Sequence, residues 1–302
     1  MLNIPDFSKS DVCVEVLKQD KHTRLEGICI ESFFREHYFE EASPDLLSTG
    51  WWFSKKAFND SDYYAIKFCH SLKFNKCDIA VFNYLKSKGV EVFIILYKDQ
   101  GYFRCEFNGL RSLDEEEITS SLKQHIVIEL KPLPSSVKNV QRQNQAIDFL
   151  TQRGQIIPNA IERFFANRIA GFKGLWDVDM FQLKEAGKLK AFEVKQKFPA
   201  KNGCFGINIG TTNFLFFLIG LGIEVEHVIL KKPVDDKDIP ALSFIVGEEY
   251  KDKNVWLYTD FNKECILDFV QKSSPSYTSI HGRYRLSYYS MRMDCFAIKG
   301  TI

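Results

Sequence analysis

The sequence lacks the motifs that mark several common classes of enzyme. It contains neither GxxxxGK(S/T) nor GxGxxG, the glycine-rich turns that hold nucleotide phosphates, so no nucleotide cofactor is expected. It also lacks GxSxG, the turn that carries the nucleophile of many serine hydrolases. Its eight cysteines form no CxxC pair, and we expect them to be reduced and buried rather than bound to zinc.

Long apolar runs and a signal peptide are missing as well. The longest apolar stretch, 214–223, is far shorter than the ~20 residues that a membrane-spanning helix needs. Residues 1–11 show no basic start followed by an apolar run. We therefore expect a cytoplasmic protein that has no membrane partner.

Net charge is small, at +1 from 40 basic and 39 acidic residues, so any binding of nucleic acid must depend on local basic patches. A chain of 302 residues is long for one core and predicts two domains. The stretch KPLPSSVKN at 131–139, with two prolines and two serines, is the best candidate boundary. We place an N-terminal α+β domain at 1–135 and a second domain at 136–302.

The N-terminal domain shows mixed patterns. Apolar residues at helical spacing predict a helix over 25–41. Three strands are predicted over 77–82, 90–98 and 102–107, and turns at 88–89 and 100–101 would join them into an antiparallel meander. A helix is expected to begin after Ser112, and a strand over 125–130. We expect this domain to recognise the target or bind a partner.

The second domain begins with two predicted helices, one over 139–152 and one that follows Pro158 and ends at Gly171. Strands are predicted over 176–183 and 189–198, joined by a turn in KEAGK. Asn208 and Thr211 could cap an apolar helix that ends near Gly220, and a strand over 226–230 follows. Short strands over 241–246 and 255–259 and a helix over 265–271 come next.

The two strands after the second helix carry the candidate chemistry. Side chains alternate between the faces of a strand, so Glu193, Lys195 and Lys197 share one face. In the preceding strand Asp177 and Asp179 share a face, and a hairpin could set an aspartate beside Glu193. Two carboxylates and nearby carbonyl groups are the ligands that Mg²⁺ prefers, and a lysine beside them could serve the attacking water.

Asp179, followed fourteen residues later by Glu193-Val194-Lys195, resembles the PD-(D/E)XK signature of restriction-endonuclease-like nucleases. The resemblance covers about 155–232 and implies an α/β fold with an αβββαβ core in the second domain. It implies that Asp179, Glu193 and the Val194 carbonyl bind Mg²⁺, for which Mn²⁺ would substitute, and that Lys195 serves the water.

Many members of that family carry a glutamate on the first helix of the core, and Glu162 stands where it would be. The resemblance implies that Glu162 holds a second metal ion or a metal-bound water. The chain departs from the pattern in having Val178, not proline, before Asp179, and in leaving little room for a first strand. Asp177 competes with Asp179 as the metal ligand because it lies on the same face.

Basic residues near the motif could bind nucleic acid. Lys190 and Lys197 belong to a lysine-rich hairpin that would attract phosphates, although a solvated hairpin surface explains such lysines equally well. Arg283 and Arg285 alternate with tyrosines in the segment 281–293, a mixture that suits phosphate contact and base stacking. The simpler interpretation of that segment is an edge strand.

The N-terminal domain also contains a weak internal repeat. IESFFREH at 30–37 resembles IERFFANR at 161–168. In the strands that follow, Asp78 would match Asp179 and Glu91 would match Glu193, but Phe93 stands where the lysine should be. The repeat is either a coincidence or a degenerate copy that binds rather than cuts.

The sequence therefore predicts a Mg²⁺-dependent endonuclease that hydrolyses DNA, with restriction, phage defence or mobile-element processing as its setting by family analogy. The alternatives are a structure-selective or RNA-directed nuclease of the same fold and a non-catalytic nucleic-acid-binding protein. Cutting both strands with one active site per chain would favour a homodimer.

Overall fold

The computed structural model describes residues 5–38, 43–56, 59–69, 74–98, 101–104, 139–168, 174–200, 203–233, 239–250, 253, 255–272, 276–278, 282–284 and 287–298. Over these residues the chain is a mixed α+β protein with parallel and antiparallel strand pairs. Within the same ranges, no helix is long and apolar enough to cross a membrane.

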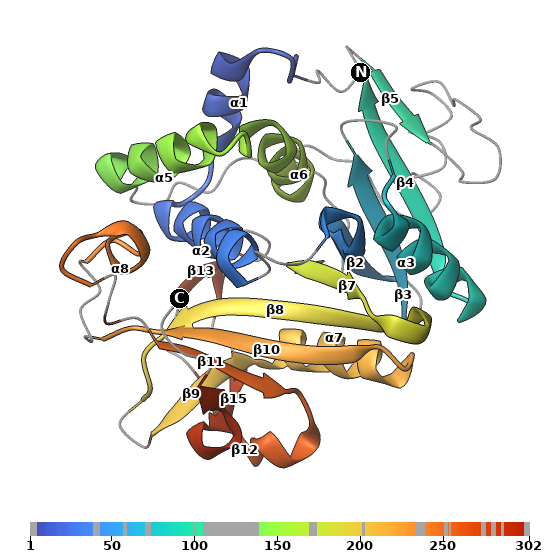
Figure 1. Cartoon of the computed structure of the whole chain (residues 1–302), viewed down its shortest axis with the longest axis vertical. Helices are drawn as coiled ribbons and strands as arrows, with labels where there is room; N and C mark the ends of the chain where they lie inside the picture. Colours follow the sequence, from blue (N-terminus) through green and yellow to red (C-terminus); the bar gives the residue numbers. More distant parts are fainter. Residues whose placement is uncertain are drawn as a thin grey trace. The chain divides into compact units, whose positions relative to one another are not determined.

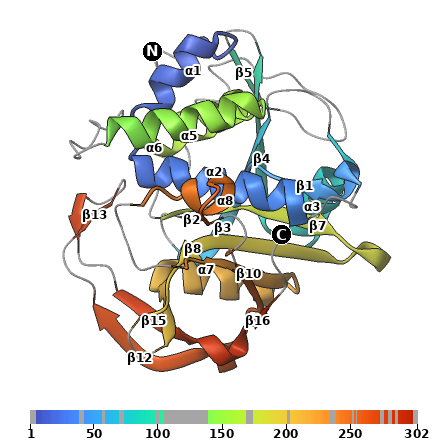
Figure 2. The same ribbon diagram turned by 60° about the vertical axis from the view of Figure 1, so that its left-hand side comes forward.

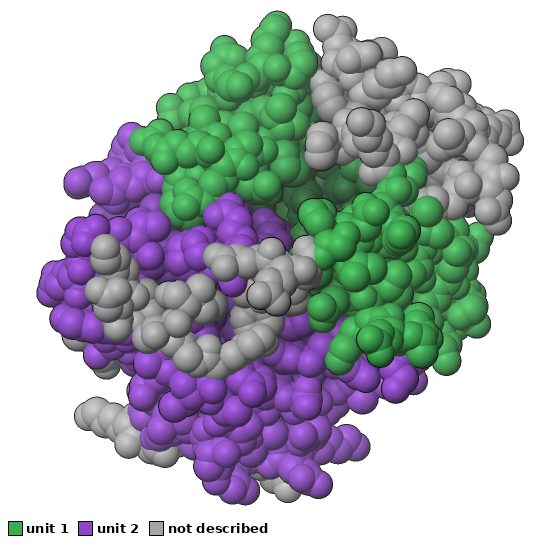
Figure 3. Space-filling view, in the orientation of Figure 1, with its two compact units in different colours: residues 1–20, 43–135, 147–187 green, residues 21–42, 136–146, 188–302 purple. Residues whose placement is uncertain are grey.

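The chain divides into two compact units, coloured separately in Figure 3. Unit 1 contains residues 1–20, 43–135 and 147–187, and unit 2 contains residues 21–42, 136–146 and 188–302. Each unit therefore draws residues from both sides of the predicted boundary at 135/136. The division between two separately folding domains at that boundary stays a prediction.

Unit 1 is built on a five-stranded sheet with the order β5-β4-β3-β2-β6 (Figure 1). Its strands are β2 (Trp51–Lys56), β3 (Asn59–Cys69), β4 (Glu91–Lys98), β5 (Gly101–Arg104) and β6 (Leu175–Val178). β3 and β4 are parallel and are joined by helix α3 (Lys76–Ser87), whereas β2 is antiparallel to both β3 and β6. A short strand β1 (Leu47–Ser48), after the turn η1 (Pro44–Leu46), pairs with β7 (Met180–Leu183).

Two helices, α1 (Ser10–Leu17) and α6 (Ile156–Arg168), pack against each other in unit 1. Phe7 contacts Phe164 edge to face, at 5.8 Å between ring centroids. Phe165 stacks on Phe68 of β3 at 5.0 Å, which fixes α6 on the sheet. Buried aromatic contacts of this kind are among the larger single contributions to a core.

Unit 2 has a sheet in which β8 (Leu189–Lys197) and β10 (Glu224–Lys231) are parallel, with β11 (Val255–Asp260) antiparallel to β10 and β16 (Ala297–Ile298) beyond it. A second sheet has the order β12 (Ile266–Lys272), β15 (Ser287–Arg292), β9 (Cys204–Asn208). β13 (Ser276–Thr278) and β14 (Gly282–Tyr284) form a separate pair.

Helix α7 (Ile209–Gly220) contacts β10 on one side and β9 and β15 on the other, so it lies between the two sheets of unit 2 (Figure 2). Helix α2 (His22–Tyr38) packs on β8 from the other face of the first sheet, as Figures 1 and 2 both show. Residues 140–146 of helix α5 (Val140–Gln152) are assigned to unit 2 and residues 147–152 to unit 1, and α8 (Ser243–Val246) is a single turn in unit 2.

Several predicted elements are confirmed. The helices predicted over 25–41 and 139–152 are α2 and α5, and the helix after Pro158 is α6, which begins two residues earlier. The strands predicted over 176–183 and 189–198 are present as β6, β7 and β8. Asn208 caps α7 as predicted, because its side-chain oxygen accepts a hydrogen bond from the Gly210 amide at 2.7 Å.

The prediction of a strand over 77–82 is wrong, because these residues belong to α3. Asn75 and Asp78 form a reciprocal capping box, in which each side chain accepts a hydrogen bond from the other residue's amide. Cys77, Val81 and Leu85 are buried at helical spacing. The first half of the predicted meander is therefore also wrong: 88–89 ends a helix, and β4 pairs in parallel with β3. Its second half is confirmed over the described residues, because β4 and β5 pair antiparallel.

Two predictions near the C-terminus are also wrong. Residues 243–246, predicted as part of a strand, form the helical turn α8. Residues 265–271, predicted as a helix, consist of the end of the turn η4 (Lys263–Cys265) and the strand β12. The helix predicted after Ser112, the strand over 125–130 and residues 105–107 lie outside the described residues.

Candidate functional site

Strand β8 places two of the predicted catalytic residues side by side. The Lys195 Nζ lies 3.2 Å from Oε1 of Glu193, as expected for residues two apart on one face of a strand. The Glu193 side chain is only 7% exposed, whereas that of Lys195 is 32% exposed. The Glu193 side chain is therefore buried, whereas the Lys195 side chain is partly accessible to solvent.

A second carboxylate reaches the same lysine from helix α2. Glu31 Oε1 lies 3.7 Å from Lys195 Nζ, and the Glu31 side chain is 15% exposed. The helix is held there by Phe34, whose ring packs 5.3 Å from Trp256 and 6.1 Å from Phe192. Glu31 was not predicted as a site residue, although its segment was recognised as similar to the one that carries Glu162.

His227 supports the backbone of β8 at Glu193. It faces Glu193 in the parallel pairing of β10 with β8, and its Nδ1 lies 2.9 Å from the Glu193 carbonyl oxygen. Burial, reinforced by the charge of Lys197, holds the pKa of His227 well below its usual value. The imidazole is therefore neutral, and because a carbonyl oxygen only accepts, Nδ1 carries the hydrogen.

Lys197, a predicted nucleic-acid-binding residue, lies on β8 and donates a hydrogen bond to the Gly206 carbonyl on β9. Desolvation by the surrounding protein, only partly offset by Glu193, lowers the pKa of Lys197 to about 8, although the side chain keeps intermediate exposure. Its positive charge is thus present at pH 7 and is lost in mildly alkaline solution.

Lys190, another predicted nucleic-acid-binding residue, is ion-paired within unit 2. Its ammonium group contacts the Glu226 carboxylate and lies 3.5 Å from Asp260 Oδ1. Burial acts to lower the pKa of Lys190, but the hydrogen bonds and charges of Glu226 and Asp260 outweigh it and raise the pKa. Because its charge is already partly compensated, Lys190 offers less to a phosphate than an unpaired lysine would.

Asp179, the third predicted catalytic residue, belongs to unit 1. Asp179 is buried and lies in the chain between β6, which pairs with β2, and β7, which pairs with β1. Asp177 lies on β6, paired with Trp52 of β2. The convergence of Asp179 with Glu193, and the choice between Asp177 and Asp179, stay predictions.

Glu162 also belongs to unit 1, whereas Lys195 belongs to unit 2. Its Oε2 accepts a hydrogen bond of 2.8 Å from the Trp52 indole nitrogen. The next residue, Arg163, is buried and forms two hydrogen bonds with the Asp20 carboxylate, at 2.7 and 2.9 Å. In unit 2 the glutamate that helix α2 places near Lys195 is Glu31, and the metal-binding role predicted for Glu162 stays a prediction.

The predicted arginines of the C-terminal segment are placed only in part. Arg283 lies on β14 and pairs with Tyr277 of β13, while Arg285 lies outside the described residues. The strand that follows, β15, is not an edge strand, because β12 and β9 flank it. The edge-strand interpretation is therefore wrong for 287–292.

The oxygen donors near Lys195 suit a hard divalent cation. Glu193 and Glu31 supply carboxylates, and β8 supplies the Val194 carbonyl. No group of three or more His, Cys, Asp and Glu side chains that could hold a metal occurs in the described ranges. Mg²⁺ is commonly bound through one or two carboxylates, with water and substrate phosphate completing its shell, and its binding here stays a prediction.

Comparison of the chain with protein-family models, with curated proteins and with solved structures gave no match. The functional assignment therefore depends on the site itself.

Proposed function

We propose that this chain is a metal-dependent endonuclease that hydrolyses DNA phosphodiester bonds, with its catalytic centre at Glu193 and Lys195. The observation that carries the proposal is the 3.2 Å contact between a buried carboxylate and a partly exposed ammonium group on one strand, with Glu31 close to the same ammonium. The PD-(D/E)XK pattern and an αβββαβ core, with Asp179 as a further ligand, are part of this proposal.

The proposed ligands of Mg²⁺ within unit 2 are the Glu193 carboxylate and the Val194 carbonyl, with Glu31 as the second carboxylate. A bound Mg²⁺ would supply Lewis-acid chemistry, polarising a phosphate oxygen and lowering the pKa of a coordinated water. Mn²⁺ has the same charge and a similar preference for oxygen ligands, so we expect it to substitute.

Lys195 is the residue that we assign to the reacting atoms. Its Nζ lies 3.2 Å from Glu193 Oε1 and 3.7 Å from Glu31 Oε1. In the proposed mechanism the ammonium group donates to the attacking water or to a non-bridging phosphate oxygen. Negative charge grows on that oxygen in the transition state, so a fixed ammonium group binds the transition state more strongly than the substrate.

Glu193 orients Lys195, and His227 in turn holds the backbone at Glu193 through the Nδ1 hydrogen bond to its carbonyl oxygen. A neutral, buried imidazole adds no charge to the site. His227 therefore acts as a positioning residue for the strand that carries both catalytic side chains.

The test is cleavage of supercoiled plasmid, linear duplex, single-stranded DNA and RNA with Mg²⁺ or Mn²⁺. Lys195→Met should lower the rate by at least about 100-fold, because it removes the cation from the reacting phosphate. Lys188→Met is the matched control: Lys188 is an exposed lysine immediately before the same strand, and its loss should leave the rate within about twofold. Equal rates for wild type and Lys195→Met would contradict the proposal, and RNA as the preferred substrate would replace its DNA component.

A further inference from the structure

The two units repeat one order of elements. In unit 1, β3 leads through helix α3 into the parallel strand β4, and β5 then returns antiparallel to β4. In unit 2, β8 leads through helix α7 into the parallel strand β10, and β11 then returns antiparallel to β10. The strand β9, between β8 and α7, is the main addition in unit 2.

The covering helices also correspond. Residues 30–34 of α2 read IESFF, and residues 161–165 of α6 read IERFF. Phe34 packs on Phe192 of β8, and Phe165 stacks on Phe68 of β3. Helix α2 precedes the strands of unit 1 in the chain but belongs to unit 2, and α6 precedes β8 but belongs to unit 1. Each unit thus carries the helix that precedes the other unit's strands.

The strand registers identify the equivalent positions. The parallel pairing of β3 with β4 ends at Cys69, and that of β8 with β10 ends at Lys197. Two residues before these ends lie Lys67 and Lys195, so the catalytic lysine has a counterpart in unit 1. Four residues before the same ends, unit 1 has Ala65 and unit 2 has Glu193. This alignment replaces the one predicted from the sequence, in which Asp78 and Glu91 were the counterparts of Asp179 and Glu193.

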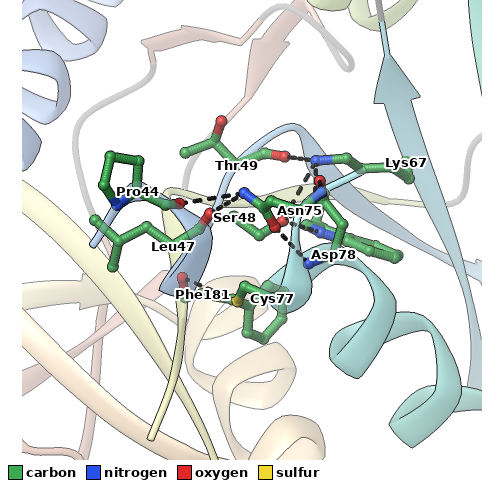
Figure 4. Close-up of polar contacts among 10 residues, drawn as sticks. Pro44, Leu47, Ser48, Thr49, Lys67, Asn75, Cys77, Asp78 and Phe181 are labelled. Atoms are coloured by element: carbon green, nitrogen blue, oxygen red, sulfur yellow. Dashed lines mark hydrogen bonds and ion pairs between the residues drawn. The ribbon is translucent and has the colours of Figure 1, made fainter. Parts of the chain in front are cut away.

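The surroundings of Lys67 differ from those of Lys195. Lys67 is buried, its Nζ lies 2.8 Å from Asp78 Oδ1 and 3.3 Å from Ser48 Oγ, and it donates to the Thr49 carbonyl (Figure 4). Asp78 is fixed by the capping box with Asn75, and Ser48 donates to Asp78. Three acceptors satisfy the three hydrogens of the ammonium group.

We infer that unit 1 is a second copy of the unit 2 core, in which the lysine of the catalytic position has become a structural ion pair and no longer serves catalysis. Alanine at position 65 supplies no carboxylate for a metal, and the Lys67 ammonium group is fully occupied inside the protein. The inference depends on the proposed function for its statement that unit 2 is the active copy. It assigns one catalytic centre to each chain, so a double-strand break requires two chains or two successive cuts.

The test compares the same substitution at the two equivalent lysines. Lys67→Met should keep the cleavage rate within about twofold at a temperature where it is folded, but it should lower the unfolding midpoint by roughly 10 °C because Asp78 is left buried without its cation. Lys195→Met should lower the cleavage rate by at least about 100-fold at a temperature where it is folded. The double variant Lys67→Met/Asp78→Leu, which removes both charges, should recover most of the lost midpoint.

Calorimetric titration with Mn²⁺ adds a measurement that does not need turnover. Binding should be lost in Glu193→Gln and kept in Lys67→Met. Loss of cleavage in folded Lys67→Met, or an unchanged unfolding midpoint for it, would overturn the inference. A wild-type protein that cuts no substrate would contradict the proposed function. The unfolding measurements do not depend on catalysis, so they would still test the structural role of Lys67.

Discussion

Replacing Arg163 by methionine should destabilise unit 1 strongly. Arg163 is 3% exposed and Asp20 is 5% exposed, and the guanidinium group holds the carboxylate with two hydrogen bonds of 2.7 and 2.9 Å. Methionine preserves most of the packing volume but leaves the carboxylate buried without a cation. Breaking a buried pair in this way costs about 3–5 kcal/mol of unfolding free energy.

The loss is measurable by urea unfolding followed by tryptophan fluorescence, since Trp51, Trp52 and Trp176 all belong to unit 1. Trp52 is a direct reporter, because the Arg163 guanidinium lies 5.9 Å from its ring centroid. With a slope of about 3 kcal/mol per M, the midpoint should fall by roughly 1–1.7 M.

The double variant Arg163→Met/Asp20→Leu removes both charges and should recover most of the midpoint, because the penalty comes from the unpaired ion. Arg292→Met provides the control. Arg292 pairs with Asp294 at the surface of unit 2, and its loss should give no measurable shift. A shift below about 0.3 M for Arg163→Met would refute the reasoning that this ion pair holds α6 in place.

Three further predictions concern unit 2. Glu31→Gln should lower the cleavage rate about 10- to 100-fold, whereas Glu162→Gln, at the corresponding position of unit 1, should leave the rate within about twofold; the reverse order would support Glu162, rather than Glu31, as the site residue. His227→Phe keeps an aromatic ring but loses the hydrogen bond to the Glu193 carbonyl, so the affinity for Mn²⁺ measured by calorimetry should fall about tenfold. An unchanged affinity would contradict the positioning role of His227. At pH 7, Lys197→Gln should reduce the slope of log affinity against log salt concentration for DNA binding by about one unit. At pH 9.5 it should have little effect, because the lowered pKa of about 8 leaves the wild-type lysine neutral there. An equal effect at both pH values would contradict the lowered pKa.

The part of the site that lies on one strand could be predicted from the sequence. Alternation along β8 has a period of two residues, so Glu193 and Lys195 must share a face wherever the strand lies, and the 3.2 Å contact follows from that rule. The cap of α7 at Asn208 was predictable for a similar reason, because it depends only on neighbouring residues.

Other features depend on distant packing and could not be predicted from local patterns. The role of Glu31 requires that α2 cover β8, although the strands of unit 1 follow it in the chain. The segment 77–82 has an apolar pattern that fits either a strand or a helix, and the reciprocal capping by Asn75 and Asp78 decides for a helix. The long strand β3, which carries Lys67, had no strand prediction at all, so the correct internal repeat was missed.

The most direct test of the central claim is a titration of divalent metal in a plasmid-cleavage assay, comparing wild type with Glu193→Gln. Glu193→Gln is nearly isosteric but removes the charge that would hold the cation beside Lys195. The account predicts no cutting by wild type in chelator, saturable cutting with Mg²⁺ or Mn²⁺, and at least about 100-fold less for Glu193→Gln at every concentration. Cutting that is independent of added metal, or equal in the two proteins, would contradict the assignment of the catalytic centre to Glu193 and Lys195.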